Sequence, residues 1–307
     1  MTAGACSSIE ASYAACRRLS RRSGSSFYPS FLLLPPPERR AMDALYAFMR
    51  YTDDLVDRDA PTDQRTTELA AWRVAVARAT GAEDLVTNSD ANEFVCLDSS
   101  SGSDPYTILP ALADTVARYR IPTEHLMAVI DGVDMDLSPR AFETFAELER
   151  YCEKVASAVG LACIHVWGFQ GPEALEPARC CGVALQMTNI LRDIRSDARL
   201  GRVYLPMEDL HNCSYSVEEL RSGVGDERFV RLMNLELQRT RDYYRRGESL
   251  ARLLAPRGRR VFGLIMSVYR ELLARIERHP TFVLDTRVAL PRARKLWLAA
   301  RWTWGPV

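Results

Sequence analysis

Two acidic clusters, 140 residues apart, hold the side chains best suited to chemistry. Asp53 and Asp57 lie in "FMRYTDDLVD", and Asn189, Asp193 and Asp197 lie in "QMTNILRDIRSD". In each cluster the acids are four positions apart, so on an α-helix they project from one face, one turn apart. Like charges at this spacing repel, and the arrangement lowers helix stability unless a positive group lies between them.

A divalent cation is the natural positive group at such a spacing. Mg²⁺ prefers carboxylate oxygens together with the oxygens of a bound phosphate. Arg50 and Arg192 each lie close to one acidic pair, and guanidinium groups bind phosphate oxygens in bidentate fashion. Gln186, three residues before Asn189, falls on the same face of its helix. The clusters therefore predict sites for Mg²⁺ and a phosphorylated substrate.

A single acidic pair on a helix is usually a solvated surface, and each cluster alone is open to that interpretation. Here both clusters are embedded in apolar helical sequence, with Leu45, Phe48, Leu55 and Val56 around the first. The hypothesis of a metal site therefore depends on the pair of clusters rather than on either one.

The periodicity of apolar residues predicts helices throughout, with no sustained strand pattern. "LLLPPPERRAM" and "FQGPEAL" each end one segment and begin another. We expect a single all-α domain over 21–290, with an N-terminal segment (1–20) that is partly flexible, a polar loop (81–105) and a Trp-rich tail (291–307). The predicted helices cover 8–20, 38–58, 63–79, 106–120, 123–135, 142–166, 173–197, 226–253 and 258–277.

The composition excludes several classes of protein. Lys+Arg and Asp+Glu both number 40, which argues against a nucleic-acid partner. Eight cysteines without a C-x-x-C pair favour a reducing compartment over a disulfide framework. The sequence shows neither a secretory signal nor a transmembrane stretch, so we expect a cytoplasmic protein. Nothing in the sequence predicts an oligomeric state.

The last residues, "KLWLAARWTWGPV", combine three tryptophans with Lys295 and Arg301. Such a segment is suited to peripheral contact with the inner face of a membrane. It is equally suited to packing on the domain as an aromatic tail, and the sequence leaves both interpretations open.

Three extended stretches resemble the squalene/phytoene synthase family, all-α enzymes that join two prenyl diphosphates head to head. The likeness covers roughly residues 20–290. The stretches that carry it are "SGSSFYPSFLLLPPPERRAMDALYAFMRYTDDLVD", "YCEKVASAVG" and "ALQMTNILRDIRSDARLGRVYLP". The resemblance implies a helical bundle of the isoprenoid-synthase type around a central apolar cavity. Within the family, "DGVDMDL" and "YCEKVASAVG" look closest to bacterial hopanoid-pathway members that make presqualene diphosphate from two farnesyl diphosphates.

The resemblance also implies roles for individual residues. Two or three Mg²⁺ ions would be held by the metal-ligand set, and Tyr151 would lie near the leaving diphosphate or the allylic cation. Asp54 would serve the helix instead of the metal. The implied metal ligands are Asp53, Asp57, Asn189, Asp193 and Asp197, and the implied diphosphate-binding residues are Ser26, Arg50, Gln186, Asn189, Arg192, Tyr269 and Arg287.

Neighbouring activities remain as alternatives. Phytoene or dehydrosqualene synthesis would use the same residues, since C15 and C20 substrates differ only in chain length. Reduction to squalene would need NADPH, which we do not expect this chain to require. A non-catalytic assembly factor of the same fold would be expected to lose acidic ligands, and all four acids are present.

Two related classes of enzyme fit the sequence less well. A chain-elongating prenyl synthase would carry a second D-D-x-x-D motif, which "NILRDIRSD" is not. A terpene cyclase would have Glu where Asp197 stands.

Overall fold

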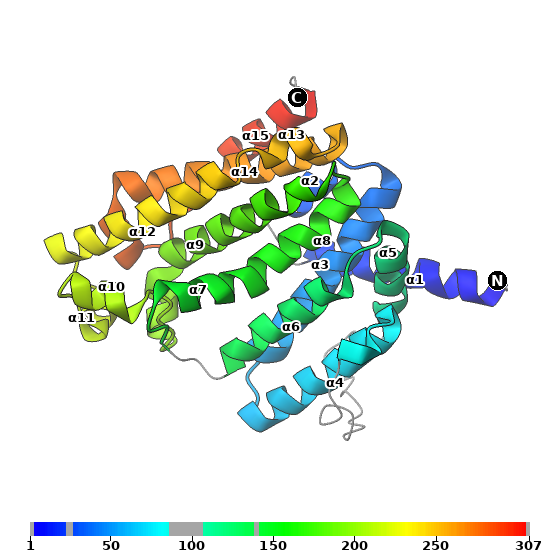
Figure 1. Cartoon of the computed structure of the whole chain (residues 1–307), viewed down its shortest axis with the longest axis horizontal. Coiled ribbons are helices and arrows are strands. Elements are labelled where there is room, and N and C mark those ends of the chain that lie inside the picture. The colour runs from blue at the N-terminus through cyan, green and yellow to red at the C-terminus, as the bar shows by residue number, and fades with distance from the viewer. Residues whose placement is uncertain (1–2, 23–26, 86–106, 138–140, 305–307) are drawn as a thin grey trace. The chain divides into compact units, whose positions relative to one another are not determined.

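A computed structural model describes residues 3–22, 27–85, 107–137 and 141–304 of the chain. These residues form helices and short helical turns and contain no β-strand, which confirms the prediction of an all-α fold. They group into two compact units, one of Met1–Leu137 with Leu161–Phe169 and the other of Ser138–Gly160 with Gln170–Val307 (Figure 1). No helix in the described ranges is both long and apolar enough to cross a membrane.

The first unit is built around helix α3, which carries the first acidic cluster. Prolines at the cap and at the first helical position start α3, because the fixed φ of proline suits a helix start. The unit contains α1 (Ala3–Arg22), α2 (Tyr28–Phe31), α3 (Pro36–Asp57), α4 (Thr62–Thr80), η1 (Glu83–Leu85), α5 (Leu109–Tyr119), α6 (Thr123–Leu137) and most of α8 (Ala158–Trp167).

Trp72 of α4 fixes the end of α3 from the apolar side. Its side chain is fully buried, its ring stacks with Phe48 at 6.2 Å between centroids, and its indole N–H donates to Thr52 Oγ1 at 2.9 Å. The Thr52 hydroxyl in turn donates to the Phe48 carbonyl at 2.8 Å. A buried indole with its N–H satisfied holds the helix in one position. The acids next to Thr52 are therefore placed by a rigid core.

The second unit is organised along helix α9, which carries the second acidic cluster. Helix α12 packs along α9, as Figure 1 shows, and Thr188 Oγ1 lies 3.0 Å from the Tyr244 hydroxyl between them. The unit contains α7 (Phe145–Cys152), η4 (Glu153–Ser157), the start of α8, η5 (Pro172–Ala174), α9 (Leu175–Arg199), α10 (Met207–Asn212), α11 (Val217–Ser222), α12 (Glu227–Arg246), α13 (Leu250–Leu253), α14 (Pro256–Arg278), η6 (Pro280–Leu284) and α15 (Arg292–Trp304).

The turn η4 is π-helical and contacts α9 very closely. A Cβ atom on Gly182 would lie 2.4 Å from the Cα and 2.6 Å from the backbone nitrogen of Ser157. The Ser157 hydroxyl donates to the Arg179 carbonyl of α9 at 2.7 Å, which ties the two backbones together. Only glycine allows this approach, and Gly182 lies on the same face of α9 as Gln186 and Asp193.

The structure departs from the predicted helices in several places. The predicted helix 142–166 is interrupted by the π-helical turn, and 226–253 is divided into α12 and α13. Helices α10, α11 and α15 had no counterpart in the prediction, and the Trp-rich tail is helical up to Trp304. Most of the predicted loop 81–105 lies outside the described residues.

We expect Gly182→Ala to destabilise the protein by about 1–3 kcal/mol, the usual cost of overpacking a core. The neighbouring atoms are backbone and cannot move aside as a flexible side chain would. Gly160→Ala is the matched control, because its Cβ would meet the Ala178 carbonyl at an ordinary 3.7 Å. Denaturant unfolding measures both variants. Equal stability of the two variants would contradict the close contact between α9 and η4.

Candidate functional site

The first acidic pair lies on the last two turns of α3. Asp53 and Asp57 are exposed, while Leu55 and Val56 on the other side of the helix are buried in the first unit. The sequence predicted this division of the helix into an acidic and an apolar face. Solvent, and any ion that it carries, reaches this side of α3, although the protein around Asp53 removes part of the water from its carboxyl group.

The Asp53 carboxyl binds its proton unusually tightly. Desolvation by the surrounding protein and the negative charge of Asp57 raise its pKa to about 7, although Arg50 opposes the shift. Asp136 of α6 adds to the same repulsion, which places a further acid near the pair. An acid held partly neutral by like charges is a position where a cation would release free energy.

Asp54 differs from its neighbours because it has a nearby cation. Arg50 Nη2 lies 2.6 Å from Asp54 Oδ1, one helical turn away and on the surface. Desolvation raises the pKa of Asp54, and Arg50 lowers it. The contact holds Arg50 beside the acidic pair, and the role of Asp54 in the helix rather than in metal binding stays a prediction.

The second cluster forms a polar face along α9. Gln186, Asn189, Asp193 and Asp197 are all partly buried on this face. Asn189 Nδ2 donates to Gln186 Oε1 at 3.3 Å. Within the described part of the chain, the buried Asn189 Oδ1 has no hydrogen-bond partner. An unpaired carbonyl oxygen beside carboxylates is a suitable ligand for a hard cation.

Asp193 is held by two arginines. Arg192 Nε donates to Asp193 Oδ1 at 2.9 Å, and its Nη2 donates to Oδ2. Arg287, 94 residues further along the chain, adds bonds of 2.7 Å from Nε and 3.3 Å from Nη2 to the same two oxygens. Burial alone would raise the pKa of Asp193, but the two guanidinium groups lower it below its usual value. The carboxylate is therefore ionised, and both of its oxygens accept hydrogen bonds from guanidinium groups.

Tyr269 of α14 completes this polar group. Burial raises the pKa of its phenol, and the nearby Arg192 and a hydrogen bond from Asn189 lower it. The structure thus brings together Asn189, Arg192, Asp193, Tyr269 and Arg287 from α9, from α14 and from the segment before α15.

Tyr151 lies in a cluster of three aromatic rings. Its ring stacks with Tyr204 at 5.4 Å between centroids and contacts Phe142 at 5.3 Å. Tyr204 comes from "GRVYLP", so two of the stretches that carry the family resemblance meet here. Tyr151 also lies in the last turn of α7, two residues before η4 begins, and π-helical turns occur frequently at functional sites. Buried aromatic faces of this kind stabilise a cation electrostatically.

The structure places the predicted residues as two groups within separate units, and Ser26 lies outside the described residues. Sequence reasoning missed Asp136, Tyr204 and Phe142 as members of these groups. Asp136 stands in "DGVDMDL" and Tyr204 in "GRVYLP", stretches already noted for the resemblance, so their motifs were the available signal. Phe142 had no such signal, because its contact with Tyr151 arises from the fold.

The residues fit Mg²⁺ that arrives with a diphosphate better than a resident structural metal. Among the described residues, no group of three or more His, Cys, Asp or Glu side chains could hold a metal ion. Mg²⁺ bound through one or two carboxylates keeps its other positions for water and phosphate oxygens. The unpaired Asn189 Oδ1 and the mutually repelling Asp53 and Asp57 suit that mode of binding.

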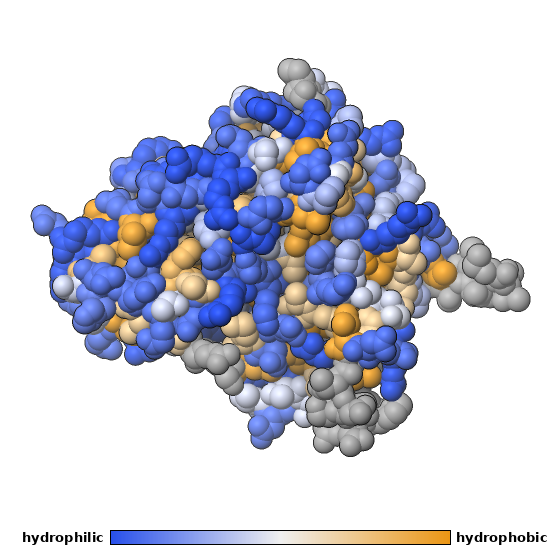
Figure 2. All heavy atoms as spheres, viewed as in Figure 1, coloured by the Kyte–Doolittle hydropathy of each residue, from blue (hydrophilic) through white to orange (hydrophobic). Residues whose placement is uncertain are grey.

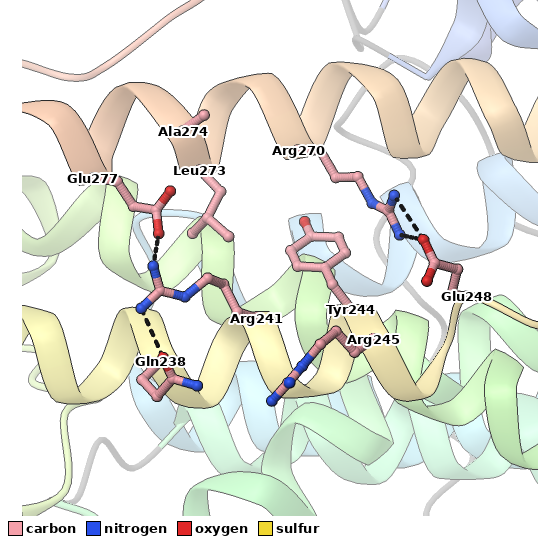
Figure 3. A pocket seen from close by; sticks show the side chains of 9 residues that line it. All are labelled: Gln238, Arg241, Tyr244, Arg245, Glu248, Arg270, Leu273, Ala274 and Glu277. Atoms are coloured by element: carbon pink, nitrogen blue, oxygen red, sulfur yellow. Dashed lines mark hydrogen bonds and ion pairs between the residues drawn. The ribbon is translucent and has the colours of Figure 1, made fainter.

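A groove between α12 and α14, shown in Figure 3, is separate from these groups. Its volume is about 390 Å³. Its charged side chains are paired within the groove or at its rim: Arg241 with Glu277, Arg270 with Glu248 and Arg245 with Asp242. None of the predicted site residues lines the groove, so it does not match the predicted diphosphate site.

Comparison with known proteins identifies the family of the chain. Residues 20–294 match the squalene/phytoene synthase family. The chain belongs to this family. It is a prenyltransferase of isoprenoid biosynthesis, and members of the squalene/phytoene synthase family condense prenyl diphosphates and generally depend on Mg²⁺.

Relatives in the family differ in their products. The chain is 33% identical to 15-cis-phytoene synthase of Synechococcus elongatus, covering 95% of this chain and 92% of the relative. It is 36% identical to presqualene diphosphate synthase of Rhodopseudomonas palustris over 66% of each chain. A crystal structure of a dehydrosqualene synthase with ligand superposes with a TM-score of 0.80 at 25% identity, covering 96% of both chains.

We expect Asp53→Asn to stabilise the metal-free protein more at pH 8 than at pH 4. With a pKa of about 7 in the folded state against 3.8 in the unfolded state, Asp53 retains its proton on folding, so stability falls as pH rises from about 4 to about 7. Asp53→Asn has no carboxyl group to titrate at this position, so its stability does not fall in this way. Melting temperatures in EDTA at both pH values measure the difference between variant and wild type.

Asp242→Asn is the control, because it removes an acid from an exposed ion pair on α12. It should show no such pH-dependent gain. An equal effect of Asp53→Asn at both pH values would mean that the pKa of Asp53 is not raised.

Proposed function

We propose that this enzyme catalyses the Mg²⁺-dependent head-to-head condensation of two farnesyl diphosphates to presqualene diphosphate. The observation that carries the proposal is the polar group on α9, where Asn189 Oδ1 is unpaired and two arginines converge on Asp193. Both a cation and a diphosphate would find complementary partners there. The motif resemblance and the presqualene diphosphate synthase among the relatives support the C15 substrate.

In the proposed reaction, the first farnesyl diphosphate loses its diphosphate and becomes an allylic cation. Two or three Mg²⁺ ions, when bound, would act as Lewis acids that stabilise the departing diphosphate. Asp53, Asp57, Asn189, Asp193 and Asp197 are the proposed ligands. Arg50, Arg192, Arg287, Tyr269, Gln186 and Ser26 are the proposed diphosphate contacts.

The second farnesyl chain then supplies the electrons for the new bond. Its C2–C3 double bond attacks the cation, a proton leaves, and the cyclopropane ring closes. The products are presqualene diphosphate, pyrophosphate and one proton, so no reductant is consumed and NADPH is not required. Tyr151 and the neighbouring rings of Tyr204 and Phe142 are proposed to stabilise the cation through their faces.

Phytoene synthesis from two C20 substrates is the second candidate. Its support is specific, because phytoene synthases of Synechococcus elongatus and Synechocystis are each 33% identical to nearly the whole chain. Dehydrosqualene synthesis from C15 substrates is a third outcome of the same chemistry. The polar groups described above serve all three reactions, so the product must be identified directly.

The cytoplasmic location and the contact of residues 291–307 with the inner face of a membrane remain predictions. Six cysteines are buried free thiols, which supports a reducing compartment: Cys16, Cys152, Cys163, Cys180, Cys181 and Cys213.

We predict that purified protein with labelled farnesyl diphosphate and Mg²⁺, without NADPH, yields presqualene diphosphate. Asp53→Asn and Asp193→Asn should each reduce turnover by at least about 100-fold, because each removes a proposed ligand of the Mg²⁺ that would stabilise the leaving diphosphate. Mass spectrometry of the extracted products measures the result.

Asp54→Asn is the matched control for Asp53→Asn, and it should retain activity within about threefold, because Asp54 is not among the proposed metal ligands and its exposed pair with Arg50 is weak. A C40 product formed only from geranylgeranyl diphosphate would contradict the C15 assignment but not the family chemistry. Full activity of Asp53→Asn and Asp193→Asn would overturn the proposed metal ligands.

A further inference from the structure

Helix α15 is attached to α14 along one side only. Leu298 is fully buried, and the Trp302 indole N–H donates to Ser267 Oγ at 2.9 Å. The Trp302 ring lies against Gly263, where a Cβ atom would come within 2.2 Å of it. Arg294 Nε donates to Glu271 at 2.9 Å. These contacts orient the helix and determine which side chains point away from α14.

The opposite side of α15 presents large apolar side chains to solvent. Leu296 is 71% exposed, Trp297 48% and Trp304 82%. At 100° per residue these three positions lie within about one third of the helix circumference. Most proteins bury residues of this size, so a row of them on one helix indicates a binding surface.

Basic side chains border this apolar row. Arg292 and Arg301 are exposed on its two edges, and the Arg301 guanidinium lies 5.8 Å from the centre of the Trp297 ring. The helix contains four basic residues, Arg292, Arg294, Lys295 and Arg301, and no acidic one. Its outward surface is therefore apolar in the middle and positive at the edges.

We propose that this outward face of α15 binds the surface of an anionic lipid bilayer. Tryptophan and leucine side chains enter the headgroup region, while arginines beside them contact lipid phosphates. The exposed apolar area, on the order of 400 Å² for two tryptophans and a leucine, is about half of what each partner buries in a stable protein dimer. Charge and size therefore both favour a membrane over a second copy of the chain.

The inference does not depend on which prenyl diphosphate is the substrate. It gives the enzyme a fixed orientation at a bilayer, and it assigns the binding to side chains that none of the proposed catalytic steps uses. Binding to vesicles needs no substrate, so its failure is distinguishable from failure of the proposed reaction.

Flotation with lipid vesicles tests the proposal. The full chain should bind vesicles of phosphatidylcholine with 30% phosphatidylglycerol, and binding should weaken with added salt and with vesicles of phosphatidylcholine alone. Trp297→Gln combined with Trp304→Gln should reduce the partition coefficient about tenfold or more. Arg292→Gln combined with Arg301→Gln should reduce it for anionic vesicles only.

Leu296→Gln and Leu85→Gln form a matched pair, since Leu85 is 45% exposed on η1 in the other unit. The first should weaken vesicle binding and the second should leave it unchanged. Circular dichroism checks that every variant is folded. Vesicle binding that is absent in the wild type, or equal in wild type and tryptophan variants, would overturn the proposal. A dimer in sedimentation that the tryptophan substitutions abolish, without vesicle binding, would also overturn it.

Discussion

The negative charge of carboxylates placed one helical turn apart, on α3 and on α9, is the feature on which the candidate site depends. On α9, Arg192 and Arg287 neutralise Asp193 and lower its pKa. On α3, Asp53 instead retains its proton to near-neutral pH because desolvation and Asp57 act together. The negative charge is thus compensated by arginine on α9 and by a retained proton on α3. On both helices, a divalent cation with a bound diphosphate would compensate the negative charge of the acids more completely.

The helices that carry these acids are held firmly from their other sides. Buried Trp72 supports α3 through Thr52, and Gly182 allows the backbone of η4 to lie directly against α9. Each contact holds its helix against the core of its own unit, so the acids on that helix keep a fixed position within the unit. On the face of the molecule seen in Figure 2, hydrophilic side chains dominate, and apolar side chains occur in small separate groups.

Periodicity and spacing predicted the all-α fold, most helix positions and the two acidic faces, because these depend on local sequence. The π-helical turn was not predicted, because it depends on the close contact between Ser157 and Gly182, which are distant in sequence. The pairing of Arg287 with Asp193 spans 94 residues, and no local pattern specifies it. Helix α15 was not predicted because its position depends on a contact distant in sequence, the packing of Trp302 against Ser267 of α14.

The polar group on α9 is proposed to bind Mg²⁺ and diphosphate together. Calorimetric titration of inorganic pyrophosphate into the protein, with and without Mg²⁺, tests it most directly. Because the arginines already hold Asp193, we predict that pyrophosphate binds at least about tenfold more tightly with Mg²⁺ than in EDTA. Equal affinity for pyrophosphate with Mg²⁺ and in EDTA would contradict joint binding and would mean that the arginines bind the diphosphate without a metal ion.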